Sequence, residues 1–508
     1  MRCHKTLLCA TLLFAIGISS KASLAEWDGY QPIPEGFDFG DKAFRDKFNT
    51  WDLLTPDKRP ELREHAWRVW VGTMQSLPND QAGMWKGWPV TRSWPITPDV
   101  LDNENLVKNY GLMDKSVAVS ALGASAYALQ SPHVNTGSYE YKPLDGYSGC
   151  ADYDSNKVVD GKYFQSNGDI MIPLESFSIE AYNYIRDNKI YTVDGMNEHK
   201  GNIHFPQDSV LTKQMLWPVK QDGISALPIW EISKAPIWNE QFSGPDPYGF
   251  TGYAGYELWN KAVGVAVSAP EGRPFGSNVN LEYLYAKLIA RDGAPEIPTP
   301  IRKEGTLYSI NDFYNAQVTQ EIWDELSEDD KVILNATSCW ANARPFKVND
   351  YLITVAMHTI TKEIEPWTLQ TAWWSDQTRN NNIIYNQNRP DDLPSGAWGN
   401  YMLSESSNIK EANGKFAIAV NPYIEGVIHP IATNCRNCHS RAGWPNREED
   451  EGATEQRSVD GFPACYDILG IISEGTPEQQ KACMGKNAIR TDFSWVLGDR
   501  VTNSKQTD

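Results

Sequence analysis

The sequence predicts an α+β fold with a helical N-terminal part, an antiparallel β-rich central domain and a mainly helical or loop-like C-terminal segment. Three observations predict this order. Apolar residues recur at helical spacing near the start, short runs with strand preference fill the middle, and a cysteine- and histidine-containing motif lies near the end. With 508 residues, 41% of them hydrophobic, the chain is large enough for two or three globular domains. The predicted segments are 1–25, 26–165, 166–400 and 401–508.

Residues 1–25 are predicted to form a secretory signal peptide. Arg2 and Lys5 precede a short apolar run, and small residues at Ser23 and Ala25 suit a cleavage site near Ala25. The apolar run is too short to cross a bilayer, and no later segment reaches that length. We therefore expect an exported protein without a membrane span.

The segment 26–165 is rich in Trp and Pro and is predicted to be helical. Pro60 begins a pattern typical of a helix, since proline is favoured in the first turn. A second, Ala-rich helix is expected over residues 112–129. The apolar stripe of the first helix consists of Leu62, Ala66, Val69, Trp70 and Met74.

The central segment 166–400 is predicted to be a largely antiparallel sheet, because short runs with strand preference alternate with turn residues. A helix over residues 311–328 is expected to be inserted among the strands. The predicted strand runs are 169–173, 210–217, 263–268, 306–310 and 351–361.

The last of these strands carries Met357 and His358 next to each other. Successive side chains of a strand point to opposite faces, so these two residues cannot serve the same site. Only one of them can face a cofactor bound on one side of the sheet.

The motif near the end of the chain is Cys435-Arg436-Asn437-Cys438-His439. Residues three and four apart share one face of a helix, so both cysteines can form thioethers to one porphyrin while His439 binds the iron. The pattern therefore predicts a c-type haem attachment site with one covalently bound haem c. A redox dithiol and a zinc site with Cys465 and Cys483 are the alternatives, but the sequence lacks the βαβ context and the paired cysteine spacing that they require.

Cys435, Cys438 and His439 make the chain resemble c-type cytochromes. A wider resemblance connects it to large bacterial periplasmic cytochrome-c-family proteins, in which a histidine-bearing strand and a tryptophan-rich segment precede the attachment motif. Here that strand carries His358, and the tryptophans that follow are Trp367, Trp373 and Trp374. The resemblance implies periplasmic haem attachment and carries no particular substrate.

The second axial ligand of the iron is left open by the sequence. His358 is the first candidate and Met484, which follows the motif, is the second. Met484 directly follows Cys483, and a disulfide there would restrict its reach. An open or water-bound position is another alternative, and the remaining candidates are His429, His204 and His199.

Charge and cysteine content constrain the partners and the compartment. Loss of the signal lowers the formal net charge from −19 to about −22, which argues against nucleic acid and favours a redox partner with a basic docking face. Four cysteines remain beside the haem pair, and an oxidising compartment favours their pairing. We expect the pairs Cys150–Cys339 and Cys465–Cys483.

Two functions are favoured by these observations, and a ligand-binding protein whose haem senses redox state or gas is a third alternative. The first is a periplasmic monohaem c-type cytochrome that transfers electrons. The second is a haem enzyme, a peroxidase or substrate oxidase, with an open distal site built against the central domain and a small-molecule substrate. The large segment ahead of the motif favours the enzyme, whereas the single attachment motif favours the carrier.

Overall fold

The computed structural model describes a central part of the chain and shorter pieces on either side. The predicted signal peptide, the helix over 112–129, His429, the Cys465–Cys483 pair and Met484 lie outside the described residues. The described residues are 58–74, 149–150, 171–232, 262–284, 287–289, 301–326, 328–378, 380, 384–391, 397–407, 416–417, 419, 421–423, 435–440, 442–444, 476–477, 489–494 and 497.

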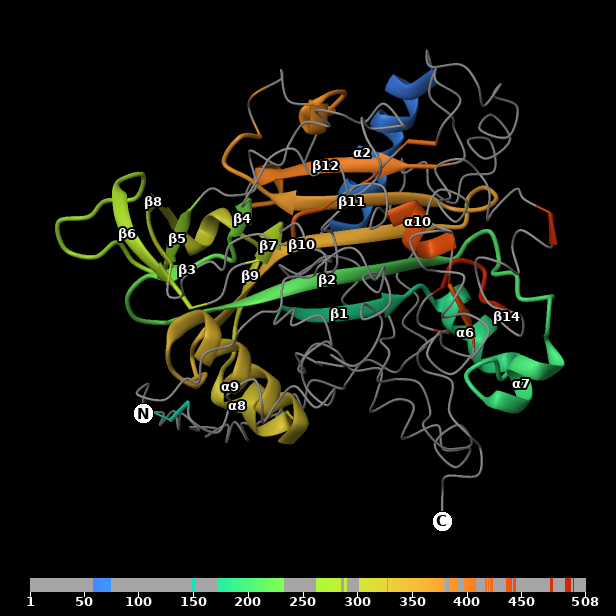
Figure 1. Ribbon diagram of the computed structural model, residues 1–508, viewed down its shortest axis with the longest axis horizontal. Helices are drawn as coiled ribbons and strands as arrows, with labels where there is room; N and C mark the ends of the chain where they lie inside the picture. Colours follow the sequence, from blue (N-terminus) through green and yellow to red (C-terminus); the bar gives the residue numbers. More distant parts are fainter. Residues whose placement is uncertain are drawn as a thin grey trace, which may run out of the picture.

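A six-stranded antiparallel sheet forms the centre of the molecule (Figure 1). Its strands follow the order β1-β2-β10-β11-β12, and β9 pairs with β10 beside this path. The prediction of an α+β chain with an antiparallel sheet is confirmed at this level. The strands are β1 (Ile172–Phe177), β2 (Val210–Val219), β9 (Asn315–Gln317), β10 (Tyr351–Thr361), β11 (Thr368–Trp374) and β12 (Tyr401–Ser406).

Three strands of this sheet are buried along their whole length. Every residue of β2, β11 and β12 is buried, including polar side chains such as Lys213 and Gln370. Burial of both faces explains why these strands lack the polar and apolar alternation of a half-exposed sheet. Strand β12 also extends the sheet beyond residue 400, the boundary expected from the sequence.

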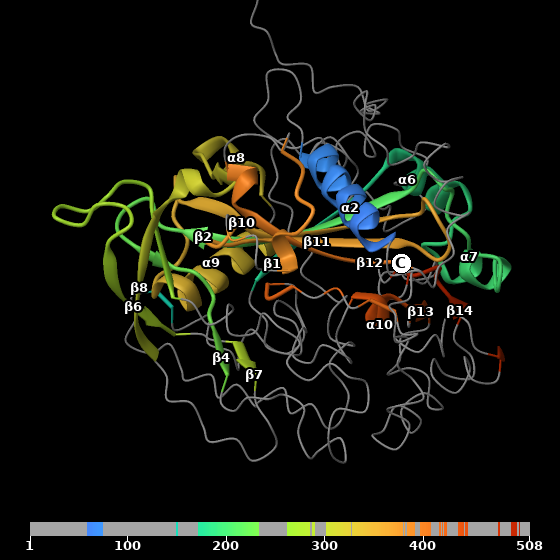
Figure 2. The same ribbon diagram turned by 90° about the horizontal axis from the view of Figure 1, so that it is seen from above.

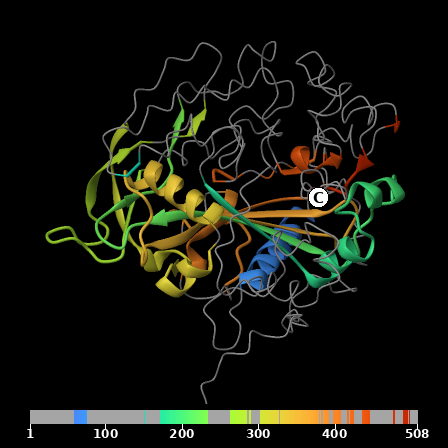
Figure 3. The same ribbon diagram turned by 90° about the horizontal axis from the view of Figure 1, so that it is seen from below.

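Helices α2 (Arg59–Met74) and α10 (Cys435–Ser440) lie on opposite faces of this sheet (Figures 2 and 3). The predicted stripe of α2 is buried at Leu62, Ala66, Val69 and Trp70, so this helix is confirmed. Within the described part of the chain, no helix has both the length and the apolar character needed to cross a bilayer.

Two buried polar contacts attach α2 to the sheet. Arg63 Nη1 donates to Glu405 Oε2 of β12 at 2.6 Å. His65 Nε2 lies 2.9 Å from Glu363 Oε2, just beyond the end of β10. These contacts fix α2 on one face of the sheet, and α10 lies on the opposite face.

Helices α6 (Ile179–Asp187) and α7 (Val193–Glu198) follow β1 at the end of the sheet near α10 (Figure 1). Each has an N-cap hydroxyl, Ser178 for α6 and Thr192 for α7, that accepts a hydrogen bond from a backbone N–H of the first turn. Their buried side chains belong to the apolar cluster that also contains Cys435.

A second, smaller sheet has the strand order β3-β5-β8-β6, and β4 pairs with β7. Two pairs, β5 with β8 and β4 with β7, are parallel, so this part is mixed rather than antiparallel. The strands of the four-stranded sheet are β3 (Ser225–Ala226), β5 (Val263–Ala266), β6 (Asn278–Tyr283) and β8 (Ile301–Ser309). The separate two-stranded sheet consists of β4 (Trp230–Ile232) and β7 (Lys287–Ile289).

The predicted helix over 311–328 is wrong. The segment contains the 3₁₀ helix η7 (Ile310–Asp312), strand β9 and the short helix α8 (Gln320–Glu325). Pairing of β9 with the start of β10 extends the backbone here, and Thr319 then caps α8. Tertiary pairing thus overrides local helix preference.

Two further 3₁₀ helices, η8 (Ile384–Asn386) and η9 (Ala397–Asn400), precede β12.

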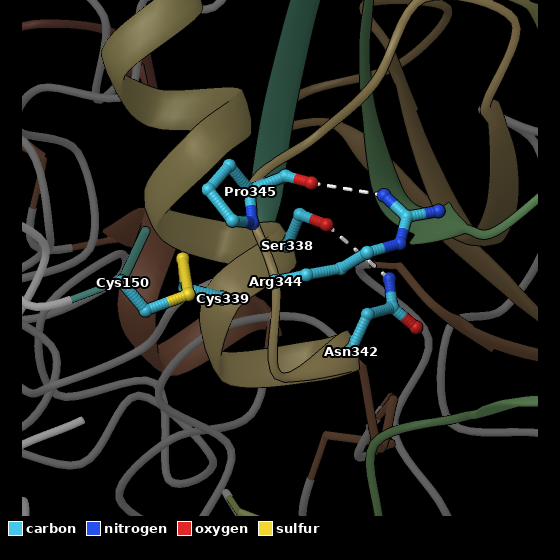
Figure 4. Close-up of a disulfide and its surroundings, with 6 residues drawn as sticks. All are labelled: Cys150, Ser338, Cys339, Asn342, Arg344 and Pro345. Carbon is cyan, nitrogen blue, oxygen red and sulfur yellow. Dashed lines mark hydrogen bonds between the residues drawn. A yellow bond between two sulfur atoms is a disulfide. The ribbon is translucent and has the colours of Figure 1, made fainter. Parts of the chain in front are cut away.

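A disulfide joins Cys150 to Cys339 in helix α9 (Glu328–Asn342), which confirms the predicted pairing (Figure 4). Asn342 donates to Ser338 Oγ within this helix, and Arg344 Nη1 donates to the carbonyl of Pro345 just after it. The disulfide connects segments separated by 189 residues. It therefore holds the chain before the central sheet against a helix that packs on that sheet.

Candidate haem-binding site

Helix α10 places the attachment motif on the face of the sheet opposite α2. Its six residues put Cys435, Cys438 and His439 at positions i, i+3 and i+4, as the sequence predicts. The side chains of Cys435 and His439 are buried, and that of Cys438 lies outside the described part. Cys435 N donates to Ala419 O at 3.0 Å, which attaches the start of the helix to the neighbouring chain.

His439 is oriented by a backbone acceptor. Its Nδ1 lies 2.7 Å from the carbonyl oxygen of Phe493, and a carbonyl can only accept, so Nδ1 carries the hydrogen. In the neutral form of the ring, the lone pair is then on Nε2. This is the arrangement that a metal-binding histidine requires.

Phe493 belongs to a four-residue turn, residues 491–494, which we call the proximal turn. The turn follows strand β14 (Ile489–Arg490), which pairs with β13 (Gly443–Trp444) just after α10. Thr491 N donates to Ala442 O, and Ala442 N donates to His439 O. The backbone thus connects the proximal turn to the helix that carries His439.

His358 faces His439. The two ring centroids are 5.5 Å apart and the ring planes meet at 65°, an edge-to-face contact. Met357, the residue before His358 in β10, points to the other face of the strand and is 1% exposed. The structure therefore answers which of the two β10 side chains faces the motif.

The environment of His358 keeps it neutral. Desolvation lowers its pKa well below the ordinary value, and the nearby His439 and Lys213 lower it further. The ring nevertheless keeps intermediate solvent exposure. A neutral imidazole that retains accessible surface is the form in which histidine binds metals.

A row of polar residues crosses the sheet at the level of His358. In the strand register, His358 lies opposite Lys213 of β2 and Thr371 of β11, and Thr371 lies opposite Ser404 of β12. Residues opposite each other point to the same face, so the row faces α10. All of its members except His358 are buried, and Asn421 Nδ2 donates to Thr371 Oγ1 at 2.8 Å.

Apolar side chains surround Cys435 beside this polar row. The cluster contains sheet residues, residues of α6 and α7, and residues of the C-terminal segment. Such surroundings exclude water and lower the local dielectric, both of which tune a bound haem. Members on the sheet and C-terminal side are Leu211, Ile360, Leu369, Ile489, Phe493 and Leu497.

The separation of the two histidine rings is compatible with imidazoles that would bind one metal ion. Two imidazoles that share a metal have ring centres about 6 Å apart, since each metal–nitrogen bond is about 2 Å long. The observed 5.5 Å lies within about 1 Å of that separation. Cys435 begins the same helix turn as His439, as thioether attachment requires.

The other histidines proposed as iron ligands, His199 and His204, do not lie beside His439 in the way that His358 does. His199 caps the end of α7, and the His204 side chain is exposed. Among the described residues, no group of three or more His, Cys, Asp or Glu side chains converges to hold a metal ion. The zinc alternative stays untested, because Cys465, Cys483 and the side chain of Cys438 lie outside the described part of the chain.

Sequence reasoning missed Phe493, Lys213, Thr371 and Asn421. The one charged residue in β2, a strand in which most residues are apolar, was a signal for Lys213. The Phe493 acceptor is a main-chain atom and has no residue-type signal. Comparisons with protein-family models, curated proteins and solved structures find no match for this chain.

Proposed function

We propose that the chain is a periplasmic monohaem c-type cytochrome that transfers electrons. Cys435 and Cys438 hold one haem c covalently, His439 is the proximal ligand and His358 is the distal ligand. The observation that carries the proposal is the pair of imidazoles with centroids 5.5 Å apart, one of them oriented by a backbone carbonyl.

Each residue has a defined part in this proposal. Bound haem supplies a one-electron couple of its iron. His439 presents Nε2 because Nδ1 donates to Phe493 O, and His358 offers a lone pair because its surroundings keep it neutral. Two fixed axial ligands leave the oxidation state free to change without ligand exchange, which suits an electron carrier better than a peroxidase.

Compartment and partner follow from independent features. The Cys150–Cys339 disulfide is compatible with an oxidising compartment, as is the predicted signal peptide. A mature net charge of about −22 favours encounter with a redox partner that has a basic docking face.

The haem enzyme with an open distal site is the second candidate. The observation that favours it is the polar row, because Lys213 and Thr371 beside His358 could assist proton transfer at an open site. In that case His358 would act as an acid or base rather than as a ligand.

The decisive experiment combines haem staining with optical spectra. The protein, coexpressed with a haem-attachment system, should keep its haem on a denaturing gel, whereas Cys435→Ala/Cys438→Ala should not. The purified protein should be low-spin in both oxidation states and should not bind carbon monoxide. A stained band with a high-spin spectrum and rapid carbon monoxide binding would instead support the enzyme.

A matched pair of variants tests the distal ligand. His358→Ala should become high-spin and bind carbon monoxide while keeping its covalent haem. Met357→Leu changes the adjacent residue on the opposite face and conserves volume, so it should keep the low-spin spectrum. An unchanged spectrum in His358→Ala would exclude His358 as the ligand.

A further inference from the structure

Asp492 of the proximal turn is held by two hydrogen bonds from outside the turn. Its Oδ1 accepts from Lys362 Nζ at 2.7 Å, and its Oδ2 accepts from Phe205 N at 2.8 Å. Lys362 directly follows β10, and Phe205 lies before β2. Both donors thus belong to the segments that carry the sheet, whereas Asp492 lies beside the carbonyl that orients His439.

The ion pair between Lys362 and Asp492 is buried, although Lys362 Nζ also donates to the carbonyl of Pro366 at 3.2 Å. The side chain of Lys362 is only 1% exposed and that of Asp492 is 7% exposed. Its ammonium also contacts Glu365 at 2.6 Å, but Glu365 is 68% exposed, so that pair is more strongly screened by water. The buried Lys362–Asp492 pair is therefore a firm connection between sheet and turn, beside the hydrogen bond from Phe205 N.

The backbone of the proximal turn needs such a connection. Asp492 and Phe493 have φ angles of 49° and 65°, in the left-handed region that residues with a Cβ atom seldom adopt. Thr491 Oγ1 donates to Ser494 O at 2.7 Å and closes the turn internally. Contacts outside and inside the turn thus hold the Phe493 carbonyl toward Nδ1 of His439.

We propose that Lys362, Asp492 and Thr491 are positioning residues that set the strength of the His439–Phe493 hydrogen bond and, through it, the reduction potential of the haem. The inference rests on the proposed function, since it requires His439 to bind the iron. Donation from Nδ1 to a carbonyl makes Nε2 a more basic ligand, which favours ferric iron. Loosening the turn should therefore raise the reduction potential.

Two changes that leave the net charge unaltered test this direction. Lys362→Met/Asp492→Asn removes one positive and one negative charge together. Thr491→Val removes only the hydroxyl that closes the turn. Each should raise the reduction potential by about 59 mV, corresponding to a tenfold change in the one-electron equilibrium constant, when measured by spectroelectrochemical titration.

A matched control removes another largely buried ion pair. Arg344 Nη1 and Asp350 Oδ2 are 2.7 Å apart near the start of β10. Arg344→Met/Asp350→Asn also conserves net charge, so it should leave the potential unchanged even if it lowers stability. A second readout is exchange of the His439 Nδ1 proton, followed by NMR of the ferric protein, which should accelerate only in the two variants of the turn and its anchor.

The outcomes separate this inference from the proposed function. Absence of covalent haem in the wild-type protein would overturn the proposed function. Covalent haem with an unshifted potential and unchanged proton exchange in Thr491→Val would overturn the positioning role. If the double variant does not fold, Thr491→Val still decides, because it alters one buried hydroxyl and no charge.

Discussion

Lys213 is a charged residue directly opposite the proposed distal ligand, His358, in the strand register. It is buried in β2 opposite His358, and its charge is one cause of the lowered pKa of that histidine. A cation next to an iron ligand disfavours the additional positive charge of ferric iron. Lys213 should therefore raise the reduction potential of the haem.

Replacing Lys213 with methionine tests this effect. Lys213→Met should lower the potential, by about 59 mV for a tenfold change in the equilibrium constant. Lys200→Met removes the same charge from an exposed position after α7 and should have little effect because water and salt screen it. Equal shifts in both variants would mean that only the overall net charge matters.

The alternation of side chains along β10 explains why the candidate site lies on only one face of the sheet. His358 and Met357 are adjacent in β10, yet one contacts His439 and the other is buried on the side of α2. The pleat of the strand alone makes this separation. A one-residue shift of the register would exchange the two side chains.

Helix α2 is attached to the sheet by a buried ion pair and also contains a more exposed ion pair within the helix. Arg63 and Glu405 are 3% and 1% exposed, whereas Arg68 and Glu64 of the same helix are 32% and 53% exposed. Removing one partner of a buried pair leaves an uncompensated charge, although Arg59 still contacts Glu405 at 3.2 Å. The two arginines therefore form a matched pair for measuring how the helix is held.

Arg63→Met should lower the free energy of unfolding by about 3 kcal/mol. Arg68→Met should lower it by less than about 1 kcal/mol, because solvent already screens that pair. Urea titration of the haem-loaded proteins, followed by far-UV circular dichroism, measures both. Similar costs in the two variants would show that the buried pair has no special part in attaching α2.

Helix α10 depends on other elements for its position because it has only six residues. A helix of this length is not stable by itself, so contacts with Ala419, Ala442 and the proximal turn must hold it. These contacts explain how a motif that is local in sequence acquires a defined orientation toward β10.

For the whole molecule, net charge should govern electron exchange with small charged reagents. A formal net charge of −19 attracts cations and repels anions, and salt screens both effects. Oxidation of the ferrous protein by hexaammineruthenium(III) should slow as ionic strength rises, whereas oxidation by ferricyanide should accelerate. Stopped-flow absorption measures both rates. Salt dependence of the same sign for both oxidants would contradict an electrostatic origin.

The overall arrangement shows why local reasoning succeeded for some elements and failed for others. Strand β10 and helix α2 were predicted closely because their apolar patterns match their own burial. The helix expected over 311–328 was wrong because β9 gains its hydrogen bonds from β10, a contact between distant segments. Helix α9 was missed for a similar reason, since its burial depends on the sheet and on Cys150.

The sequence by itself determined the spacing of Cys435, Cys438 and His439 along one helix face and the opposite directions of Met357 and His358, because both follow from local backbone geometry. Only the tertiary structure decided that His358 meets His439 and that the Phe493 carbonyl orients His439. The strand register placed Lys213 beside His358, and the fold brought the C-terminal turn to α10. These contacts join segments far apart in the chain, and one of them uses a main-chain atom that every residue possesses.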